Sequence, residues 1–355
     1  MGLEKKKRCC NLEKQVVREE KMCKILSRAE QSRAEYIDIY RSFGIILMVM
    51  GHIGFGIYFD HFIHAFHMPM FFFISGIFFK VNQGMTFSSF VKKKAKTLLI
   101  PYAAFGLFHY FVWLVQHRSA MSLEPLKCLL FVNTDGIPIA GALWFLTAFF
   151  FAELIYFAIR HCIKRMLLQN ISIVVISIMG CITTLILPFR LPYAMDASFV
   201  GVGLLHIGYL VQNNVIKNVR NIYHMKYYEW IILVAISMFL IFTNGYVNMR
   251  TGTYAIIPLF WINAILAIII GINLSKYLER SLLKSVHGFL LFIGRNSIVY
   301  LCLNQLIILC VRKTIRVVGL PLITTKISIF VIAMILLSLC TYVIINTRLK
   351  VFLGK

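Results

Sequence analysis

The sequence has few charged residues, and acidic ones are especially scarce. Charged side chains make up 14% of the 355 residues, and Asp and Glu together number only 14. A soluble domain carries about 25% charged residues, so this chain has too few polar side chains to cover a water-exposed surface. With 59% hydrophobic residues, the composition indicates that lipid is the solvent for much of the molecule.

The cysteines form no recognisable disulfide or metal-binding pattern. There are nine of them, an odd number, without a Cys-x-x-Cys pair, and several lie inside apolar runs. This arrangement argues against a disulfide framework and against a zinc site. Buried, unreactive thiols are the better interpretation, and no metal site is predicted.

The first 35 residues lack the apolar core of a secretory signal peptide. They are charged and nearly free of aromatic residues, which predicts a cytoplasmic extension over 1–35 ahead of a membrane domain over 36–350.

The chain also shows no internal repeat, which argues against a transporter built from two inverted halves.

Long apolar runs dominate the remainder of the sequence. Each is about 20 residues long, the length needed to cross a hydrocarbon core of about 30 Å. Backbone polar groups in lipid must bond within their own segment, so these runs are predicted to be helices. We therefore expect an all-α polytopic membrane protein with about ten transmembrane helices. The expected spans are 39–59, 62–79, 97–116, 141–159, 171–187, 193–211, 227–244, 254–274, 288–311 and 326–346.

The net charge of +23 comes from short clusters of Lys and Arg between the apolar runs, which is not a nucleic-acid-binding pattern. With the N-terminus inside, 28 of the 37 Lys and Arg residues fall on the cytoplasmic side and 8 on the outer side. The positive-inside rule then places both termini in the cytoplasm. Arg312, Lys313 and Arg316 are an exception, because they lie together outside. Either the last two spans are drawn wrongly, or these cations meet an anionic group.

The first expected span contains two ionisable residues, Arg41 and His52. Such a group costs roughly 2.5–3.5 kcal/mol on insertion scales, which makes both of them candidate functional residues. Their spacing is about three helical turns, so both face the same neighbour, about 16.5 Å apart along the helix. Asp38 lies one turn before Arg41 and is placed to pair with it. His52 can exchange a proton near neutral pH; a purely structural hydrogen bond to another helix is the alternative.

Three histidines recur at every third residue near the start of the second span: His61, His64 and His67. A metal site needs further ligands in convergent geometry, and Asp60 is the only acid nearby, so metal binding is disfavoured. The short connection between the two spans makes them antiparallel neighbours. We therefore expect His67 to lie beside His52.

A lysine cluster that includes Lys93 and Lys96 follows the second span. It is either an ordinary positive-inside cluster or a binding site for the phosphate groups of a cytoplasmic acyl donor such as coenzyme A. Glu153 lies in an otherwise apolar run, and the sequence assigns no role to it.

These motifs together resemble acyltransferase family 3. The stretch from Asp38 to His52 resembles the family's pattern of an Arg followed after ten residues by a His, here Arg41 and His52. The further matches are residues 66–76 with His67 and Ser75, the lysine-rich loop before Pro101-Tyr102, Trp144-Phe145-Leu146, and Gly294-Arg295-Asn296-Ser297. The resemblance covers about residues 36–346, and the chain is similar to the fucose 4-O-acetylase and polysaccharide O-acetyltransferase branch.

The resemblance implies a multi-pass enzyme of the cell membrane that moves an acyl group from cytoplasmic acyl-CoA, above all acetyl-CoA, to a glycan hydroxyl. The acceptor implied is a cell-surface or lipid-linked saccharide, and no permanently bound cofactor is implied. His52 would be catalytic, and Arg41, Lys93 and Lys96 would contact the donor. The residues implied in substrate-binding or supporting positions are Asp38, His67, Ser75, Trp144 and Asn304.

Two departures from the family pattern stand out. Many members carry an Arg-x-x-Arg pair where this chain has Lys93 and Lys96, and lysine keeps the charge but loses the bidentate geometry. Many members also have a histidine at the position of Asn304. The alternative function is a polysaccharide exporter or flippase without transferase activity, but such a protein needs a wide polar conduit and the spans contain few polar residues.

Overall fold

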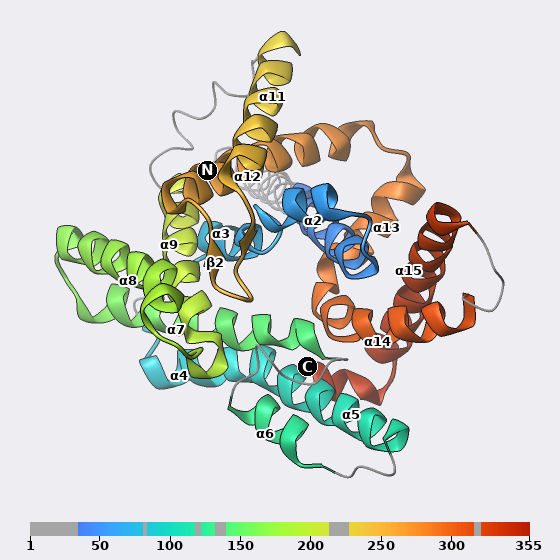
Figure 1. Cartoon of the computed structure of the whole chain (residues 1–355). Helices are drawn as coiled ribbons and strands as arrows, with labels where there is room; N and C mark the ends of the chain where they lie inside the picture. Colours follow the sequence, from blue (N-terminus) through green and yellow to red (C-terminus); the bar gives the residue numbers. More distant parts are fainter. Residues whose placement is uncertain (1–34, 81–83, 118–121, 132–139, 213–226, 316–320) are drawn as a thin grey trace, which may run out of the picture.

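The structure is a computed structural model that describes residues 35–80, 84–117, 122–131, 140–212, 227–315 and 321–355. Apart from Glu35, the expected cytoplasmic extension lies outside these residues. Nearly all of the described chain is helical (Figure 1). Its only strands are β1 (Val247–Asn248) and β2 (Thr253–Tyr254), which pair antiparallel in a short hairpin.

The first described helix spans Glu35–Ile53. The helical segments that follow it are α2 (Ile57–His64), α3 (Pro69–Ile77), α4 (Phe87–Lys94), the π-helical η1 (Ala95–Leu99), α5 (Ile100–Gln116), α6 (Glu124–Leu130), η3 (Gly141–Leu143), α7 (Trp144–Cys162), α8 (Met166–Ile186), η4 (Pro192–Ala194), α9 (Met195–Leu210), α11 (Tyr227–Asn244), α12 (Ile257–Ser281), α13 (Lys284–Arg295), α14 (Ser297–Ile315), α15 (Leu322–Asn346) and η8 (Arg348–Leu353).

Seven helical segments of the described chain are long and apolar enough to cross a membrane. They are Glu35–Ile53, Phe87–Gln116, Gly141–Cys162, Met166–Ile186, Ile257–Ser281, Ser297–Ile315 and Leu322–Asn346. Each has the length that a hydrocarbon core of about 30 Å requires. The prediction of an all-α membrane protein that crosses the membrane several times is therefore confirmed.

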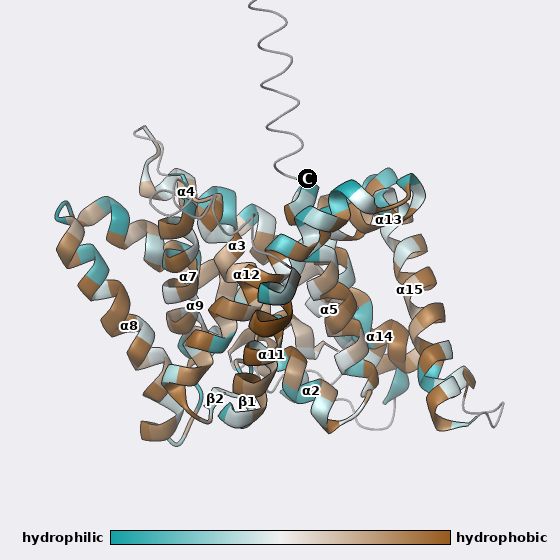
Figure 2. Ribbon diagram, turned by 90° about the horizontal axis from the view of Figure 1, so that it is seen from above, coloured by the Kyte–Doolittle hydropathy of each residue, from teal (hydrophilic) through white to brown (hydrophobic). Residues whose placement is uncertain are grey.

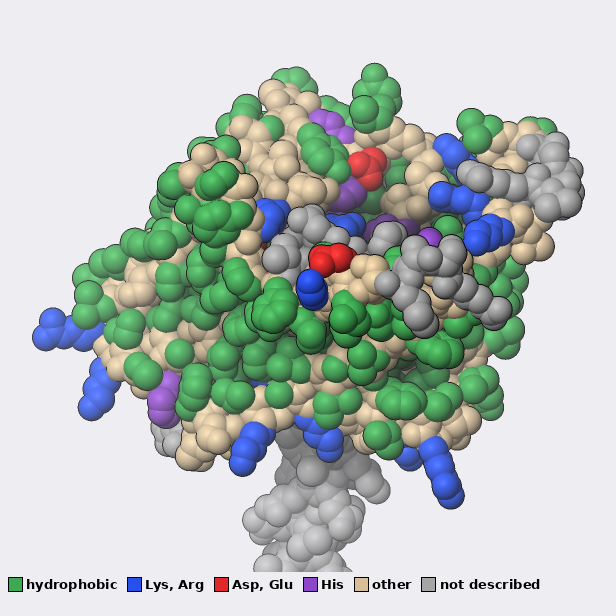
Figure 3. All heavy atoms as spheres, turned by 60° about the horizontal axis from the view of Figure 1, so that its bottom comes forward, with side chains coloured by type: hydrophobic (Ala, Val, Ile, Leu, Met, Phe, Trp, Pro, Cys, Tyr) green, Lys and Arg blue, Asp and Glu red, His purple; other side chains and the backbone are tan. Residues whose placement is uncertain are grey.

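Large hydrophobic side chains cover the outside of these helices. Leu185 on α8, Phe239 on α11 and Leu339 on α15 are all more than half exposed. Apolar patches of this extent are rare on soluble monomers, whereas lipid solvates them without cost. Figure 2 shows the hydrophobic residues along the helices and the polar ones toward the two ends, and Figure 3 shows a broad hydrophobic belt below a hollow where charged and His side chains gather.

The second expected span, 62–79, is interrupted. The chain forms α2, then a turn over residues 65–68, and then α3, which begins at Pro69. Proline has no backbone N–H and its fixed φ suits the first position of a helix. Pro69 therefore divides this segment into two short helices.

The bounds of the ninth expected span, 288–311, are wrong, because the long apolar helix of this region is Ser297–Ile315. The helix α13 ends at Arg295, and Asn296 has non-helical dihedral angles (φ −113°, ψ 23°), after which α14 begins a new direction. The α14 helix then continues to Ile315. Arg312 and Lys313 thus belong to its last turn and not to an outer loop, whereas Arg316, the third cation of the cluster, lies outside the described residues.

The helices α3 and α9 pack very closely, because each contributes a glycine to the contact. A Cβ atom at Gly76 would overlap the backbone oxygen of Leu205, and one at Gly208 would overlap the backbone oxygen of Phe73. Small residues of this kind let two membrane helices approach each other at backbone distance. This contact holds α3 against the centre of the bundle.

The two ends of the bundle are chemically distinct. At one end Glu35, at the start of the first helix, forms an ion pair with Arg295 of α13, and Gly354 packs against the backbone of Lys96. We call this the α13 end. The β1–β2 hairpin and α2 lie at the opposite end, the hairpin end (Figure 2). The first helix runs from the α13 end toward the hairpin end.

Candidate active site

His52 lies at the carboxyl end of the first helix, toward the hairpin end. Its Nδ1 atom is 3.3 Å from Nε2 of Gln305, which projects from α14. Arg312, about two turns further along α14, donates from Nη2 to the backbone oxygens of His52 (3.4 Å) and Ile53 (3.1 Å). The last carbonyl groups of a helix have no partner within it. Arg312 therefore holds the end of the helix that carries His52.

The histidines of the second span reach the same region, as expected. His67 is buried, and its Nδ1–H donates to the backbone oxygen of Ile63 at 2.7 Å, which leaves Nε2 as its acceptor nitrogen. It is close enough to His52 for the two side chains to interact electrostatically. The ring of His64 lies 5.0 Å from that of His67, measured between centroids.

Backbone and carboxylate oxygens engage the other two histidines. Nδ1 of His64 donates to the backbone oxygen of Asp60 at 2.8 Å and lies 3.2 Å from its carboxylate. His61 contacts the backbone oxygen of Gly245 instead, next to the hairpin. In the part of the chain that the structure describes, no group of three or more His, Cys, Asp or Glu side chains could hold a metal ion.

A second arginine approaches His52 from the hairpin. Arg250 interacts electrostatically with His52, and its side chain lies against Gly141, where η3 begins. A Cβ atom at Gly141 would be 2.9 Å from Nη1 of Arg250 and 3.0 Å from Oε1 of Gln305, so the glycine makes room for both. Trp144, one turn later, is packed in the core at 4% exposure.

A cavity of about 620 Å³ lies at the other end of the first helix, beside Arg41. Its basic lining residues are Arg41, Lys80, Lys93, Lys94, Arg295 and Lys355. Its apolar lining residues include Ile45, Phe71, Phe145, Leu146, Phe149 and Leu301. The cavity thus combines a strongly cationic part near the α13 end with an apolar part inside the bundle.

The apolar part of the cavity points toward His52 without reaching it. Ile45 is the lining residue of the first helix nearest to His52 in sequence, seven residues before it, which is a rise of about 10 Å. Leu301 lines the cavity on α14, one turn before Gln305. The cavity therefore ends about two turns short of His52 on the first helix and about one turn short of Gln305 on α14.

The lysines of the inner cluster separate into two groups. Lys93 lines the cavity, whereas Lys96 lies with Lys92 in a different groove along the outside of η1 and α5. In an uninterrupted α-helix residues three apart share a face, but the chain enters the π-helical turn of η1 at Ala95. A π-helical turn holds more residues than an α-helical turn, so Lys96 is rotated away from Lys93.

A buried carboxylate, Glu153, lies next to this cluster and was given no role by the sequence. Only 1% of Glu153 is exposed. Its Oε1 atom accepts hydrogen bonds from Lys94 Nζ and from Ser75 Oγ, both at 2.6 Å. The contact joins α3, α4 and α7 beside the cavity. Because a buried charge is stable only when paired, Lys94 is committed to Glu153, and Ser75 supports that pair.

Asn304, which stands where many family members have histidine, does not face His52. It is fully buried, and its Nδ2 donates to the backbone oxygens of Tyr300 (3.1 Å) and Leu301 (2.6 Å) of its own helix. The next residue, Gln305, is the one that reaches His52.

Sequence reasoning missed several residues that the structure brings to these two places. Arg312 had a signal, because it broke the positive-inside pattern, and so had Arg295, an ionisable residue within an expected span. Gln305 and Arg250 gave no signal, since one is a neutral residue in an apolar run and the other belongs to a short outer loop.

Comparison with known proteins finds one matching family. A family model described as an acyltransferase domain, that of acyltransferase family 3, matches residues 34–346. No curated protein and no solved structure matches the chain. The matched segment includes the helix with Arg41 and His52, all residues that line the cationic cavity except Leu353 and Lys355, and α14 with Gln305. The chain belongs to acyltransferase family 3 and carries a membrane-embedded acyltransferase domain.

Proposed function

We propose that the protein is an O-acetyltransferase of the cell membrane that takes an acyl group from cytoplasmic acyl-CoA and transfers it to a hydroxyl of a cell-surface or lipid-linked glycan. The single observation that carries this proposal is the cavity beside Arg41. Its cations suit phosphate groups, and its apolar part, directed toward His52, suits a thioester and its acyl chain. Coenzyme A combines these two chemical characters in one molecule.

His52 is the general base of the proposed reaction. It removes the proton from the acceptor hydroxyl while the hydroxyl oxygen attacks the carbonyl carbon of the thioester. A C–O bond forms, the C–S bond breaks, and the proton held by His52 passes to the departing thiolate of coenzyme A. Arg41 binds the donor about 16.5 Å away along the same helix. His67 lies beside His52 as a second polar group at the acceptor side.

The proposal includes an orientation in which the α13 end is cytoplasmic and both termini lie on that side. The seven long helices, together with the segment formed by α2 and α3, and with α9 and α11, would then make the ten crossings that the sequence predicts. This orientation is supported by the 28-to-8 distribution of Lys and Arg. It places the cationic cavity within reach of cytoplasmic acyl-CoA and His52 near the outer side.

Mass spectrometry of surface and lipid-linked glycans tests the function in cells with and without the protein. Acetyl esters should be present with the wild-type chain and absent without it. At equal protein level, His52→Gln should lower the transfer rate by about 10²–10⁴-fold, the range typical of general acid–base catalysis. Normal acetylation by His52→Gln would refute the role of His52. Altered glycan export without any ester would favour an exporter.

A further inference from the structure

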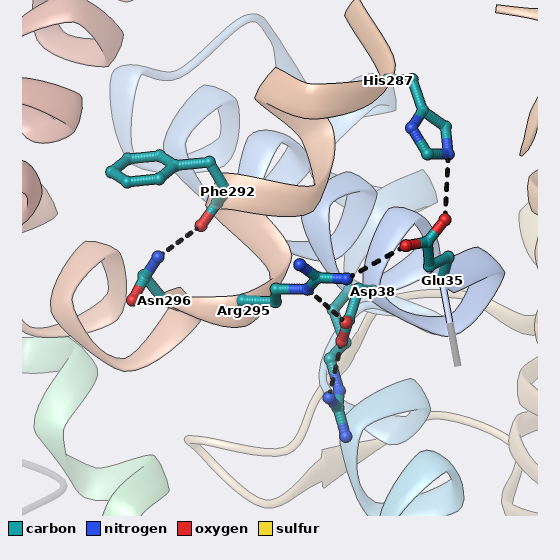
Figure 4. A network of polar contacts seen from close by, with 7 residues as sticks. Glu35, Asp38, His287, Phe292, Arg295 and Asn296 are labelled. Atoms are coloured by element: carbon teal, nitrogen blue, oxygen red, sulfur yellow. Dashed lines mark hydrogen bonds and ion pairs between the residues drawn. The ribbon is translucent and has the colours of Figure 1, made fainter. Parts of the chain in front are cut away.

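The carboxylate of Asp38 holds two arginines from different helices at the cationic part of the cavity (Figure 4). Its Oδ1 accepts a hydrogen bond from Nη1 of Arg41 at 2.9 Å. Its Oδ2 accepts one from Nε of Arg295 at 3.2 Å. Each oxygen therefore serves one guanidinium group, and both arginines line the cavity.

A second carboxylate holds Arg295 from the other side. Oε1 of Glu35 accepts a hydrogen bond from Nη2 of Arg295 at 3.3 Å, and Oε2 of Glu35 lies 3.7 Å from Nε2 of His287. Within the described part of the chain these contacts use Nε and Nη2 of Arg295 and leave its side chain half exposed. The guanidinium plane is thus oriented while the side chain stays accessible to a ligand.

Stability alone does not explain this arrangement. Ion pairs with exposed partners contribute little to stability, and the side chain of Arg295 is 50% exposed. Two guanidinium groups placed side by side also repel each other, which the shared carboxylate of Asp38 offsets. A pair of oriented guanidinium groups has a clear use, because arginine binds phosphate oxygens bidentately with parallel N–H···O bonds.

The charges around the pair are also suited to an anion. Lys80, Lys93 and Lys355 line the same cavity, and the only acidic residue among its lining residues, Glu153, is paired with Lys94. An incoming phosphate group therefore meets an excess of positive charge. Lys93 and Lys96 cannot bind a phosphate group bidentately, because an ammonium group lacks the planar set of N–H donors of a guanidinium group. Arg295 of α13 provides such a set.

We propose that Arg41 and Arg295 form a two-arginine clamp for a phosphate group of acyl-CoA, and that Asp38 is the positioning residue that aligns them. This inference rests on the proposed function. It adds Arg295 as a further residue that binds the donor, and it assigns the binding subsite of one phosphate group. The bound group is a phosphate oxyanion, either of the diphosphate bridge or of the 3′-phosphate on the ribose. The lysines of the cavity provide charge around the clamp.

Steady-state kinetics with acetyl-CoA tests the clamp in the full-length protein in membranes or nanodiscs. Arg295→Ala should raise the KM for acetyl-CoA about 10- to 100-fold, since a hydrogen bond to a charged group contributes about 1.5–3 kcal/mol. The kcat should change by less than about twofold, because the lost contact is remote from the reacting atoms. Arg295→Lys should recover only part of the loss. Arg280→Ala removes an exposed arginine of α12 that does not line the cavity, and it should leave KM unchanged.

The same measurement with 3′-dephospho-acetyl-CoA identifies the phosphate. If Arg295→Ala affects both donors equally, the clamp holds the diphosphate; if it affects only acetyl-CoA, the clamp holds the 3′-phosphate. Either result supports the proposal. Asp38→Ala should raise KM at unchanged kcat, and in the Arg295→Ala background it should raise KM by a smaller factor than it does alone, because only its contact with Arg41 then remains to be lost.

An unchanged KM in Arg295→Ala, with wild-type thermal stability, would overturn the clamp and leave the proposed function intact. Additive effects of Asp38→Ala and Arg295→Ala would overturn the positioning role of Asp38. If the wild-type protein does not transfer acetyl groups from acetyl-CoA at all, the proposed function fails instead. The two failures are therefore distinguished by the wild-type control.

Discussion

The side-chain amide of Gln305 lies 3.3 Å from Nδ1 of His52, although the two residues are separated by 253 positions in the chain. A hydrogen bond at one ring nitrogen of histidine determines which nitrogen carries the proton. When the amide N–H donates, Nδ1 is unprotonated and Nε2 carries the hydrogen. When the amide oxygen accepts, Nδ1 carries the hydrogen and Nε2 is free to act as a base. The orientation of the Gln305 amide thus controls what His52 can do.

Substitution of Gln305 tests this control. If His52 is a base through Nε2, its Nδ1–H needs an acceptor, and Gln305→Glu, which offers only oxygen atoms, should keep most of the activity. Gln305→Leu removes the hydrogen bond and should lower kcat about 10- to 100-fold at unchanged KM for acyl-CoA. Radiolabelled acetyl transfer with purified protein measures both constants.

The neighbouring amide provides the control. Asn304→Leu alters the same turn of α14 at a residue that bonds only to its own helix among the described contacts. Its effect should appear in thermal stability, with kcat per folded molecule preserved. Equal kcat for Gln305→Leu and wild type would show that the Gln305 contact has no part in the reaction.

The division of the lysine cluster predicts different kinetic effects for Lys93 and Lys96. Lys93 lines the cavity and Lys96 does not. Lys93→Ala should raise the KM for acetyl-CoA severalfold, because it removes charge near the donor phosphates, whereas Lys96→Ala should leave it unchanged. Initial-rate measurements at equal protein level distinguish the two variants. The opposite order of effects would contradict the assignment of the donor to this cavity.

The proposed orientation predicts the outcome of reporter fusions. A fusion after Lys96 and a fusion after Lys350 should both show cytoplasmic reporter activity, because the clusters of Lys and Arg at these positions stay inside. A fusion in the hairpin after Asn248 is the matched outer control and should show activity on the other side. Activity outside for either of the first two would reverse the sidedness of the donor site.

The close approach of α3 and α9 predicts a loss of stability for Gly208→Val. The added side chain would overlap the backbone of Phe73, and overpacking of this kind costs about 1–3 kcal/mol or more. The melting temperature in detergent should fall by several degrees. Gly288→Ala on α13 is the control, because its new Cβ would meet no atom within 4 Å. That variant should be as stable as wild type or slightly more so, since alanine favours helix over glycine.

The sequence alone was sufficient to predict the features that depend on interactions within one helical segment. Apolar runs of membrane length must form helices, because lipid offers no other partner to their backbone groups. The spacing of Arg41 and His52 on one helix follows from helical periodicity, and so does the pairing of Asp38 with Arg41, which the structure contains at 2.9 Å. These relationships lie within one segment, so its residues determine them.

Only the tertiary structure decided which residues of other helices contact His52 and Asp38. Gln305 and Arg312 reach His52, and Arg295 reaches Asp38, through the packing of α13 and α14 against the first helix. The break at Asn296 directs these two helices apart, which a continuous apolar run did not reveal. A π-helical turn places Lys93 and Lys96 on different faces. The three-residue spacing of the two lysines does not predict this turn. Contacts between distant segments depend on how whole helices fit together, so no local pattern in the chain specifies them.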